Sequence, residues 1–512
     1  MAKQRVFLTG ATGAMGFPGM KELLKDTGEL DLIVLAFPSK KDKAKLEPYA
    51  KHDGLEIVWG DLANYGDVRT CVRDCDIVLH VGALVSPEAD YRPNRTMQIN
   101  YGSAVNIVKA IKELGQERKT KLVSIGTVAE TGDRMPPIHW GSVGDPIKPS
   151  VFDYYAVSKI AAERHVIESG LPYWVSLRQT GIMGSAMASI EDAIIFHNCL
   201  DNVLEYVSDR DSATLLRNLC GKERQGKLGG EFWGHIFNIG GGASCRIDTC
   251  TMFKRLFGDV GITKLSGAFD SKWYATRNFH GHYYLDSDKL NDILEFRSDS
   301  IEYFHDVYLK RLGGIKTLAK VITAIPGGRK LIGGIIKKRF FKYALTDHGT
   351  VRFIDKNMEG HIAAYWGSRE AWEAIPPMEE FGHFTDWDTV VHIDHGYDKN
   401  MPEKDLSVAD MKEAARFRGG ECLSGDMDKG DWARKLRFRC AFGHEFEASP
   451  RLVLGGGHWC PVCERESWNY YERAKRDPFF AQVWYPLHPK DEKEWVYPKT
   501  VSELDVRQSA AP

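Results

Sequence analysis

Six short runs of Val, Ile and Leu punctuate the first 180 residues, and each has the length of one buried β-strand. They lie in RVFLTG, LDLIVLAF, LEIVWGDL, CDIVLHVGAL, TKLVSIGTV and YWVSLRQTGI. Between them, segments such as GSAVNIVKAIKELG and VSKIAAERHVIESG repeat apolar residues at helical spacing. Nearly continuous apolar strands joined by helical crossovers predict a doubly wound α/β fold whose parallel sheet is covered on both faces.

A glycine-rich turn follows the first strand, in RVFLTGATGAMG. Glycine at every third position lets the backbone turn tightly and approach a pyrophosphate, and the next helix supplies free N–H groups. A plain glycine-rich turn is the alternative, but the position at the first strand-to-helix junction favours a phosphate site. The residues predicted to bind a cofactor here are Gly10, Gly13, Ala14, Met15 and Gly16.

A second motif, DYYAVSKIAAE, places Tyr155 four positions before Lys159, so on a helix both side chains lie on one face. In a chain with 20 Tyr and 68 basic residues, about one such match arises by chance, so the motif depends on its context. That context is an order of motifs: glycine-rich turn, GDL, HVGAL, VSIGTV, Tyr-x-x-x-Lys and LRQTGIMG.

This order resembles the extended short-chain dehydrogenase/reductase family, whose members include nucleotide-sugar epimerases and dehydratases, hydroxysteroid dehydrogenases and flavonol-type reductases. The resemblance covers residues 4–310. It implies a Rossmann domain with a small substrate-binding lobe over residues 1–310. It also implies an NAD(P)-dependent enzyme that exchanges hydride between a nicotinamide and an alcohol or ketone.

By this resemblance Tyr155 is the acid/base on the substrate oxygen. A phenol with a pKa near 10 is a weak base at neutral pH, and a neighbouring ammonium or an oxidised nicotinamide lowers that pKa. Lys159 supplies the ammonium and binds the nicotinamide ribose. Thr127 polarises the substrate oxygen, with Ser124 as a minor alternative because Gly126 replaces the usual Ser before it. A hydroxyl that merely caps the turn is the structural alternative for Thr127.

The same resemblance assigns further cofactor contacts: Asp61 and Leu62 near the adenine, and Gly82, Ala83 and Leu84 along the wall to the nicotinamide. Asn100 is expected to be a structural residue. NAD-binding members carry an acid after the second strand, whereas this chain reads Ala36 and then FPSKKDK. Ser39 and Lys40 are therefore predicted to hold a 2′-phosphate, which favours NADP and leaves NAD open; a solvated basic loop is the alternative.

Two positions bear on the substrate. Gly181 stands where nucleotide-sugar enzymes usually carry Asn, and Val85 where the sugar epimerases carry Lys. These differences count against a sugar nucleotide. The substrate expected is a lipophilic, steroid-like alcohol or ketone, which would suit an enzyme that contacts a membrane. A nucleotide-sugar epimerase or dehydratase with bound NAD is the enzymatic alternative, and a cofactor-sensing scaffold with a zinc interaction module is the non-enzymatic one.

Residues 311–345 form a basic amphipathic segment. From Lys310 to Lys342 the chain has ten Lys or Arg and no Asp or Glu, interleaved with Ile, Leu, Val and Phe. Apolar residues with cations beside them suit a segment lying on an anionic bilayer. A solvated basic helix pair that covers the core is the equal alternative. No run approaches the 18 apolar residues of a spanning helix.

The C-terminal part contains a metal-ligand pattern. Cys440 and His444 form C-x3-H, and Cys460 and Cys463 form C-x2-C after fifteen intervening residues. Two such knuckles predict a closed tetrahedral Zn²⁺ site in a zinc-ribbon or treble-clef module over residues 431–475. A module this small could hardly build a core without the metal. His458 lies too close to Cys460 to be the expected ligand.

The remaining segments carry weaker signals. Residues 346–430 connect the two parts and are rich in aromatics and His; His383, His392 and His395 are predicted to be surface or packing residues rather than ligands. Residues 476–512 are predicted to be a partly ordered tail.

Composition adds three expectations. A net charge of −2 argues against nucleic acid as a partner. Scattered cysteines without a leader sequence favour reduced thiols and a cytoplasmic protein, peripheral at a membrane if the basic segment binds one. Family members pair through helices matching residues 104–115 and 156–168, which implies a homodimer.

Overall fold

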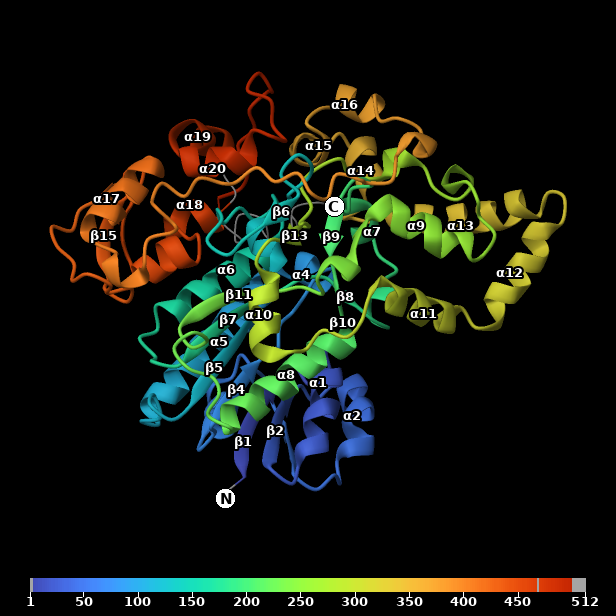
Figure 1. Cartoon of the computed structure of the whole chain (residues 1–512). Coiled ribbons are helices and arrows are strands. Elements are labelled where there is room, and N and C mark those ends of the chain that lie inside the picture. The colour runs from blue at the N-terminus through green and yellow to red at the C-terminus, as the bar shows by residue number, and fades with distance from the viewer. Residues whose placement is uncertain (1–2, 467–468, 500–512) are drawn as a thin grey trace.

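The computed structural model describes residues 3–466 and 469–499. Its centre is a sheet of seven parallel strands in the order β11-β7-β5-β4-β1-β2-β3 (Figure 1). The strands are β1 (Gln4–Thr9), β2 (Leu30–Ala36), β3 (Leu55–Trp59), β4 (Ile77–His80), β5 (Lys121–Thr127), β7 (Trp174–Gln179) and β11 (His235–Ile239). The parallel, doubly wound sheet predicted from the apolar runs is thus confirmed. Chain order reverses between β1 and β4, where ligands of such sheets bind.

Alternation along β1 shows how the sheet separates two cores. Val6 and Leu8 point into one core with α1 and α8, whereas Phe7 points into the other with α3 and α5. The helices that cover the sheet are α1 (Gly16–Leu23), α2 (Lys40–Leu46), α3 (Tyr65–Val72), α5 (Pro93–Glu113), α6 (Tyr154–Ile167) and α8 (Asp209–Arg224). Because both faces are buried, the strands needed apolar residues at consecutive positions.

The seventh strand, β11, is not among the six runs from which the sheet was predicted. It pairs in parallel with β7 from His235 to Ile239 and closes one edge of the sheet. The predicted substrate lobe consists of short elements. They are α4 (Glu88–Tyr91), β6 (Trp140–Gly141), β8 (Ile182–Met183), α7 (Ile194–His197), β9 (Val203–Glu205), β10 (Val207–Ser208), β12 (Arg246–Asp248), α9 (Thr249–Gly258), β13 (Tyr283–Tyr284) and α10 (Ser287–Leu294).

The second half of the chain wraps around this core (Figure 1). Its helices are α11 (Ile301–Leu312), α12 (Gly314–Ala324), α13 (Gly328–Ala344), α14 (Thr350–Asp355), α15 (Glu359–Trp366), α16 (Arg369–Glu373), α17 (Val408–Phe417), α18 (Pro461–Arg465), α19 (Tyr470–Arg476) and α20 (Pro478–Trp484). A three-stranded antiparallel sheet comprises β14 (Glu421–Cys422), β15 (Leu436–Arg439) and β16 (Glu445–Ala448). Of the predicted tail, residues 476–499 pack as part of the fold and Phe480 and Trp484 are buried, while residues 500–512 lie outside the described part.

Two further features concern the chemistry of the chain. All ten cysteines are free and buried. Within residues 3–466 and 469–499, no helix combines the length and the apolar content needed to cross a bilayer.

Candidate active site

The glycine-rich turn has the geometry of a phosphate cradle. Gly10 adopts φ +72°, and a Cβ on Gly16 would lie 2.0 Å from the Gly10 carbonyl oxygen. Gly13 donates its N–H to that carbonyl at 2.9 Å. Gly13 and Ala14 are exposed just before α1 begins, whereas the Met15 side chain is buried, so Met15 could contribute only its backbone. Because glycine has no side chain, the backbone at the start of this helix leaves room for phosphate oxygens.

His80 ties this turn to the next one. Gly82 donates its N–H to the Thr9 hydroxyl at 2.7 Å, and that hydroxyl lies 3.0 Å from Nδ1 of His80. Nε2 of His80 lies 3.1 Å from the Ser103 hydroxyl. Burial lowers the pKa of His80 to about 3, so the ring is neutral and can accept at one nitrogen while it donates at the other. The ends of β1 and β4 are therefore fixed relative to one another.

The predicted adenine-side residues lie beside this turn. The Asp61 carboxylate accepts the Ala63 N–H at 2.9 Å and forms an ion pair with Arg95. A Cβ on Gly82 would lie 2.8 Å from the Leu62 side chain, so Leu62 closes against the end of β4. Asp61 is half-buried, and each of its two carboxylate oxygens has a protein partner.

Asn100 connects the segment after β4 to α6. Its amide oxygen accepts the Leu84 N–H at 2.7 Å, and its amide nitrogen donates to the Leu84 carbonyl at 2.9 Å. The same nitrogen donates to the Ser158 hydroxyl at 2.8 Å, and Ser158 in turn donates to the Tyr155 carbonyl at 2.7 Å. Ala83 and Leu84 are half-buried. Asn100 thus has a structural position, inside α5 and between β4 and α6.

The basic loop after β2 differs in detail from the expectation. Ser39 caps α2: its hydroxyl accepts the Asp42 N–H at 3.0 Å and donates to the Asp42 carboxylate at 2.6 Å. Lys40 is exposed. The cation that reaches the glycine-rich turn is Lys45, whose ammonium donates to the Thr12 carbonyl at 2.8 Å. Lys45 lies in the last turn of α2, so the residues directly after β2 do not reveal its contact with the glycine-rich turn.

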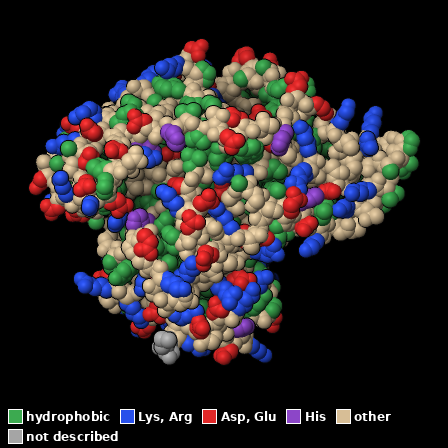
Figure 2. Space-filling model, in the orientation of Figure 1, with side chains coloured by type: hydrophobic (Ala, Val, Ile, Leu, Met, Phe, Trp, Pro, Cys, Tyr) green, Lys and Arg blue, Asp and Glu red, His purple; other side chains and the backbone are tan. Residues whose placement is uncertain are grey.

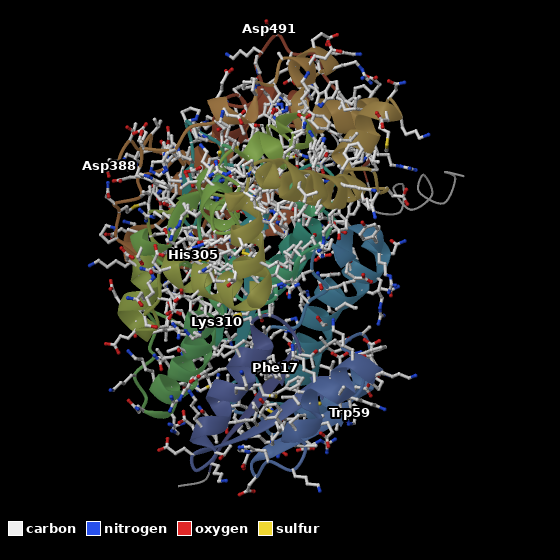
Figure 3. All side chains as sticks on the ribbon, turned by 90° about the vertical axis from the view of Figure 1, so that its right-hand side faces the viewer. Phe17, Trp59, His305, Lys310, Asp388 and Asp491 are labelled. Atoms are coloured by element: carbon white, nitrogen blue, oxygen red, sulfur yellow. The ribbon has the colours of Figure 1, made fainter. Side chains whose placement is uncertain are left out.

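Aromatic rings flank these lysines. The Lys45 ammonium lies 4.2 Å from the centre of the Phe17 ring, and the Lys43 ammonium lies 5.8 Å from that of Trp59. Figure 3 shows Phe17 and Trp59 at the same end of the molecule. Burial lowers the pKa of Lys45, and the charge of Lys41 lowers it further.

Thr127, Tyr155 and Lys159 converge at the carboxyl edge of the sheet. Thr127 is the last residue of β5, and α6 begins at Tyr154 after Asp153, whose carboxylate caps it by accepting the Ala156 N–H at 2.8 Å. The Thr127 side chain hydrogen-bonds to Tyr155. Ser124 lies within β5 and is buried. The Thr127 hydroxyl also accepts the Ala129 N–H and so caps the turn after β5, whereas its role on a substrate oxygen stays a prediction.

Burial dominates the electrostatics of these groups. It raises the pKa of the Tyr155 phenol, and the hydrogen bond with Thr127 acts in the opposite direction. Burial lowers the pKa of Lys159, while the carboxylates of Glu130 and Glu163 oppose that shift. From the sequence, a neighbouring ammonium is expected to lower the pKa of the Tyr155 phenol. In the protein by itself that pKa is raised instead, because burial dominates. At neutral pH Tyr155 carries its proton.

A buried ionic network lies behind this site. Arg178 donates to the Glu163 carboxylate at 2.5 Å and lies 3.2 Å from Glu130, whose other oxygen accepts the Thr127 N–H at 2.9 Å. Burial and the charge of Glu163 raise the pKa of Glu130 to about 8. A Cβ on Gly126 would lie 2.9 Å from Glu130, so the glycine that replaces the expected Ser makes room for these carboxylates.

The C-terminal module completes the network. His458 lies 2.9 Å from Glu163 through Nε2 and 2.9 Å from Glu464 through Nδ1. Arg178 also donates to the Gly456 carbonyl at 2.7 Å. Although burial acts to lower it, the pKa of His458 is raised because both neighbouring carboxylates favour the charged ring. His458 thus pairs with two carboxylates and is not part of the cysteine group.

Neighbouring contacts extend this attachment along α6. Arg164 donates to the Trp459 carbonyl at 3.0 Å and to the Glu464 carboxylate at 2.7 Å. Glu168 accepts from the hydroxyl of Ser449 at 2.6 Å. The module therefore packs against α6, which is one of the two helices named in the homodimer prediction. The homodimer stays a prediction.

Cys440, His444, Cys460 and Cys463 come together as one group. Nδ1 of His444 lies 3.4, 3.5 and 3.4 Å from the three sulfurs, in the order of the sequence, and the sulfurs of Cys440 and Cys463 lie 3.9 Å apart. The four ligand atoms all lie within 4.8 Å of one another. Bond lengths of about 2.3 Å to sulfur and about 2.0 Å to nitrogen separate tetrahedral ligands by about 3.5–3.8 Å. The observed spacing fits such an ion.

The three loop histidines take no part in this group. His395 is buried with Nε2 3.0 Å from the Asp145 carboxylate, and Nδ1 of His383 lies 2.8 Å from the Thr251 hydroxyl. His392 is exposed.

The N-terminal part of the chain is similar to known proteins. Residues 6–197 match the model of the NAD dependent epimerase/dehydratase family. Among curated proteins, GDP-6-deoxy-D-mannose reductase of Pseudomonas aeruginosa is 31% identical over 170 residues, 33% of this chain and 48% of that protein. Phenylcoumaran benzylic ether reductase PT1 of Pinus taeda is 29% identical over 176 residues, 34% of this chain and 47% of that protein. The chain spans about half the length of these relatives.

A solved structure of dTDP-glucose 4,6-dehydratase from Bacillus anthracis in complex with NAD is 14% identical, with a TM-score of 0.48, over 62% of this chain and 100% of that one. The family match and the two reductases agree with the sequence expectation of a nicotinamide-dependent enzyme of the extended short-chain dehydrogenase/reductase type.

Proposed function

We propose that the chain is an NAD(P)-dependent oxidoreductase that interconverts an alcohol and a ketone, with Tyr155 as the acid/base. The observation that carries this is the convergence of Thr127, Tyr155 and Lys159 at the same sheet edge as the glycine-rich turn. A bound nicotinamide would supply or accept the hydride, held by the turn at Gly10 and Gly16, where a side chain would not fit.

The protein residues then divide the remaining work. Tyr155, protonated at neutral pH, donates its proton to the ketone oxygen during reduction and recovers it from the alcohol during oxidation. Thr127 donates a hydrogen bond to the same oxygen and orients the phenol. Lys159 supplies positive charge that favours the phenolate when Tyr155 has given up its proton. The raised phenol pKa suits the donor role in ketone reduction.

The cofactor preference proposed is NADP. Lys45 places a cation at the glycine-rich turn, 2.8 Å from the Thr12 carbonyl, and Lys40 adds a second cation at the start of α2. A 2′-phosphate has two negative charges near neutral pH and suits such a position. Ser39 would contribute through its backbone, since its hydroxyl already caps α2.

Lys45→Ala tests this preference. Losing one charge-assisted contact of about 1.5–3 kcal/mol should raise KM for NADP about 10- to 100-fold, with KM for NAD nearly unchanged. The matched control is Lys43→Ala, which removes a cation from the same helix at the Trp59 ring. Steady-state kinetics with both cofactors distinguishes the outcomes. An equal rise in KM for both cofactors would show that Lys45 only shapes the turn.

A lipophilic substrate, steroid-like in size, is proposed for this site. A Cβ on Gly181 would lie 2.9 Å from the buried Tyr206 ring and 3.1 Å from Leu204, so the usual Asn of nucleotide-sugar enzymes would not fit without displacing them. The second candidate is a sugar nucleotide, favoured by the substrate named for the Pseudomonas aeruginosa reductase. Nicotinamide absorbance during incubation with a hydroxysteroid panel and with GDP-6-deoxy-D-mannose separates the two.

The group of Cys440, His444, Cys460 and Cys463 is proposed to hold a structural Zn²⁺. Its four N/S ligands leave no open position for a substrate, which is typical of structural rather than catalytic zinc. A hairpin, β15 and β16, carries the first pair, and α18 begins directly after Cys460. This arrangement favours a zinc-ribbon or treble-clef module whose role is to hold the loop at His458 against α6.

A further inference from the structure

A helical hairpin projects from the substrate lobe. α12 and α13 leave the body of the molecule after α11 and return to it (Figure 1). The side of the hairpin nearest the body is closely packed: a Cβ on Gly333 would lie 2.4 Å from the Gly267 carbonyl oxygen, and Phe340 packs 5.2 Å from the Phe269 ring centre. The inner side of the hairpin is thus packed against the body along the hairpin, and its outer side is turned away from the core.

The outer side carries large apolar side chains exposed to solvent. On α12, Ile315, Leu318 and Val321 recur every three residues, and Ile325 follows directly after the helix. On α13, Leu331 and Ile335 are one turn apart. These six side chains are 57–66% exposed. Several neighbouring exposed Ile and Leu residues mark an interaction surface, whereas single ones do not.

The same hairpin is strongly cationic. Eight of the ten Lys and Arg between Lys310 and Lys342 lie on α12 and α13, and no Asp or Glu lies among them. Within the described part of the chain, two of these eight pair with carboxylates: Lys320 with Asp259 at 3.9 Å and Arg339 with Glu191. Figure 2 shows green side chains at the projecting end, edged by blue ones, and Figure 3 views this side face-on with Lys310 near its base. Most of the positive charge of the hairpin is therefore not neutralised by carboxylates of the described residues.

We propose that the outer face of α12 and α13, here called the hairpin face, binds the surface of an anionic lipid bilayer. Its apolar side chains would enter the boundary between headgroups and acyl chains, and its cations would contact lipid phosphates. A second copy of the chain fits less well, because a symmetric contact would set the cations of one hairpin against those of the other. The hairpin face lies apart from Tyr155, so binding is independent of the proposed function.

Cosedimentation with vesicles tests the proposal. We expect the full chain to pellet with equal parts of phosphatidylcholine and phosphatidylglycerol, not with phosphatidylcholine alone, and to be released by added salt. Each cation near an anionic surface strengthens binding about fivefold, so Lys330→Gln with Lys338→Gln, both exposed, should weaken it about 30-fold. Leu331→Ser with Ile335→Ser should weaken it about tenfold for each side chain that enters the bilayer boundary.

Matched controls use residues elsewhere. Val391→Ser removes an apolar side chain that is 56% exposed, and Lys412→Gln with Lys429→Gln removes two exposed cations; all should bind vesicles as the wild type does. Unchanged thermal midpoints of the hairpin variants show that they fold. Equal pelleting with neutral and anionic vesicles, or hairpin variants that bind like the wild type, would overturn the proposal. So would a wild-type dimer that the hairpin substitutions disperse, since the face would then be a contact between copies.

Discussion

Tyr155→Phe is expected to lower kcat about 100- to 10,000-fold, the contribution typical of a positioned acid/base. The substitution removes one hydroxyl and keeps the ring, so the packing of α6 and the backbone hydrogen bond from Ser158 to position 155 are preserved. KM for the nicotinamide cofactor should change little, because the contacts assigned to the cofactor lie mainly at the glycine-rich turn and the end of β4. The rate of change of nicotinamide absorbance at saturating cofactor measures kcat.

Tyr101→Phe is the matched control for this experiment. Tyr101 lies on α5 and packs edge-on against His165 of α6 with ring centres 6.0 Å apart, so its phenol borders the same helix pair. Its loss should leave kcat near the wild-type value. If Tyr155→Phe retained wild-type turnover at an unchanged thermal midpoint, Tyr155 could not be the acid/base, and the scaffold alternative would gain support.

The direction of the pKa shift at Tyr155 extends this prediction to pH. Burial raises the pKa of the phenol, so the protonated form persists above the ordinary value near 10. Ketone reduction, which consumes that proton, should be flat across neutral pH, whereas alcohol oxidation should rise with pH because it needs phenolate. Thr127→Ala removes the hydrogen bond that lowers the pKa, so the rise in oxidation should move to higher pH, and Thr127→Ser should restore it.

The strands of the sheet could be predicted because the reason for each is local. Val6, Phe7 and Leu8 are all apolar since both sheet faces are buried, and that requirement is visible in three consecutive letters. β11 was harder to predict. It has only five residues with Asn238 among them, and what makes it a strand is pairing with β7, more than 50 positions earlier in the chain.

The candidate site shows the same division. The spacing of Tyr155 and Lys159 is a local helical property, and the glycine-rich turn is a local backbone property. The network behind them is not local, because Glu163 meets Arg178 after 15 positions and His458 after 295. The residues of α6 give no sign of which distant segment of the chain contacts them. The homodimer that the family resemblance implies stays a prediction.

Cys460→Ser should unfold the C-terminal module and weaken the catalytic helix with it. The substitution removes one of four ligands proposed for Zn²⁺, and a module of this size depends on its metal for folding. Cys460 follows His458 by two residues, so release of this loop would deprive Glu163 and Arg178 of buried partners. Breaking a buried ionic contact in this way costs about 3–5 kcal/mol in the free energy of unfolding.

Three measurements follow from this coupling. Metal analysis should find about one zinc per wild-type chain and less in Cys460→Ser, and the thermal midpoint and nicotinamide turnover of the variant should both fall. Cys422→Ser is the matched control: its thiol is buried in β14 of the same small sheet but lies outside the ligand group.

Modules that share a core should unfold together, and here Phe438 and Trp459 pack in one cluster with Ala162 and Val166 of α6. A metal-free wild type as stable as Cys422→Ser would contradict the zinc assignment. A Cys460→Ser variant that loses zinc but keeps full turnover would instead show that the module does not support the active site.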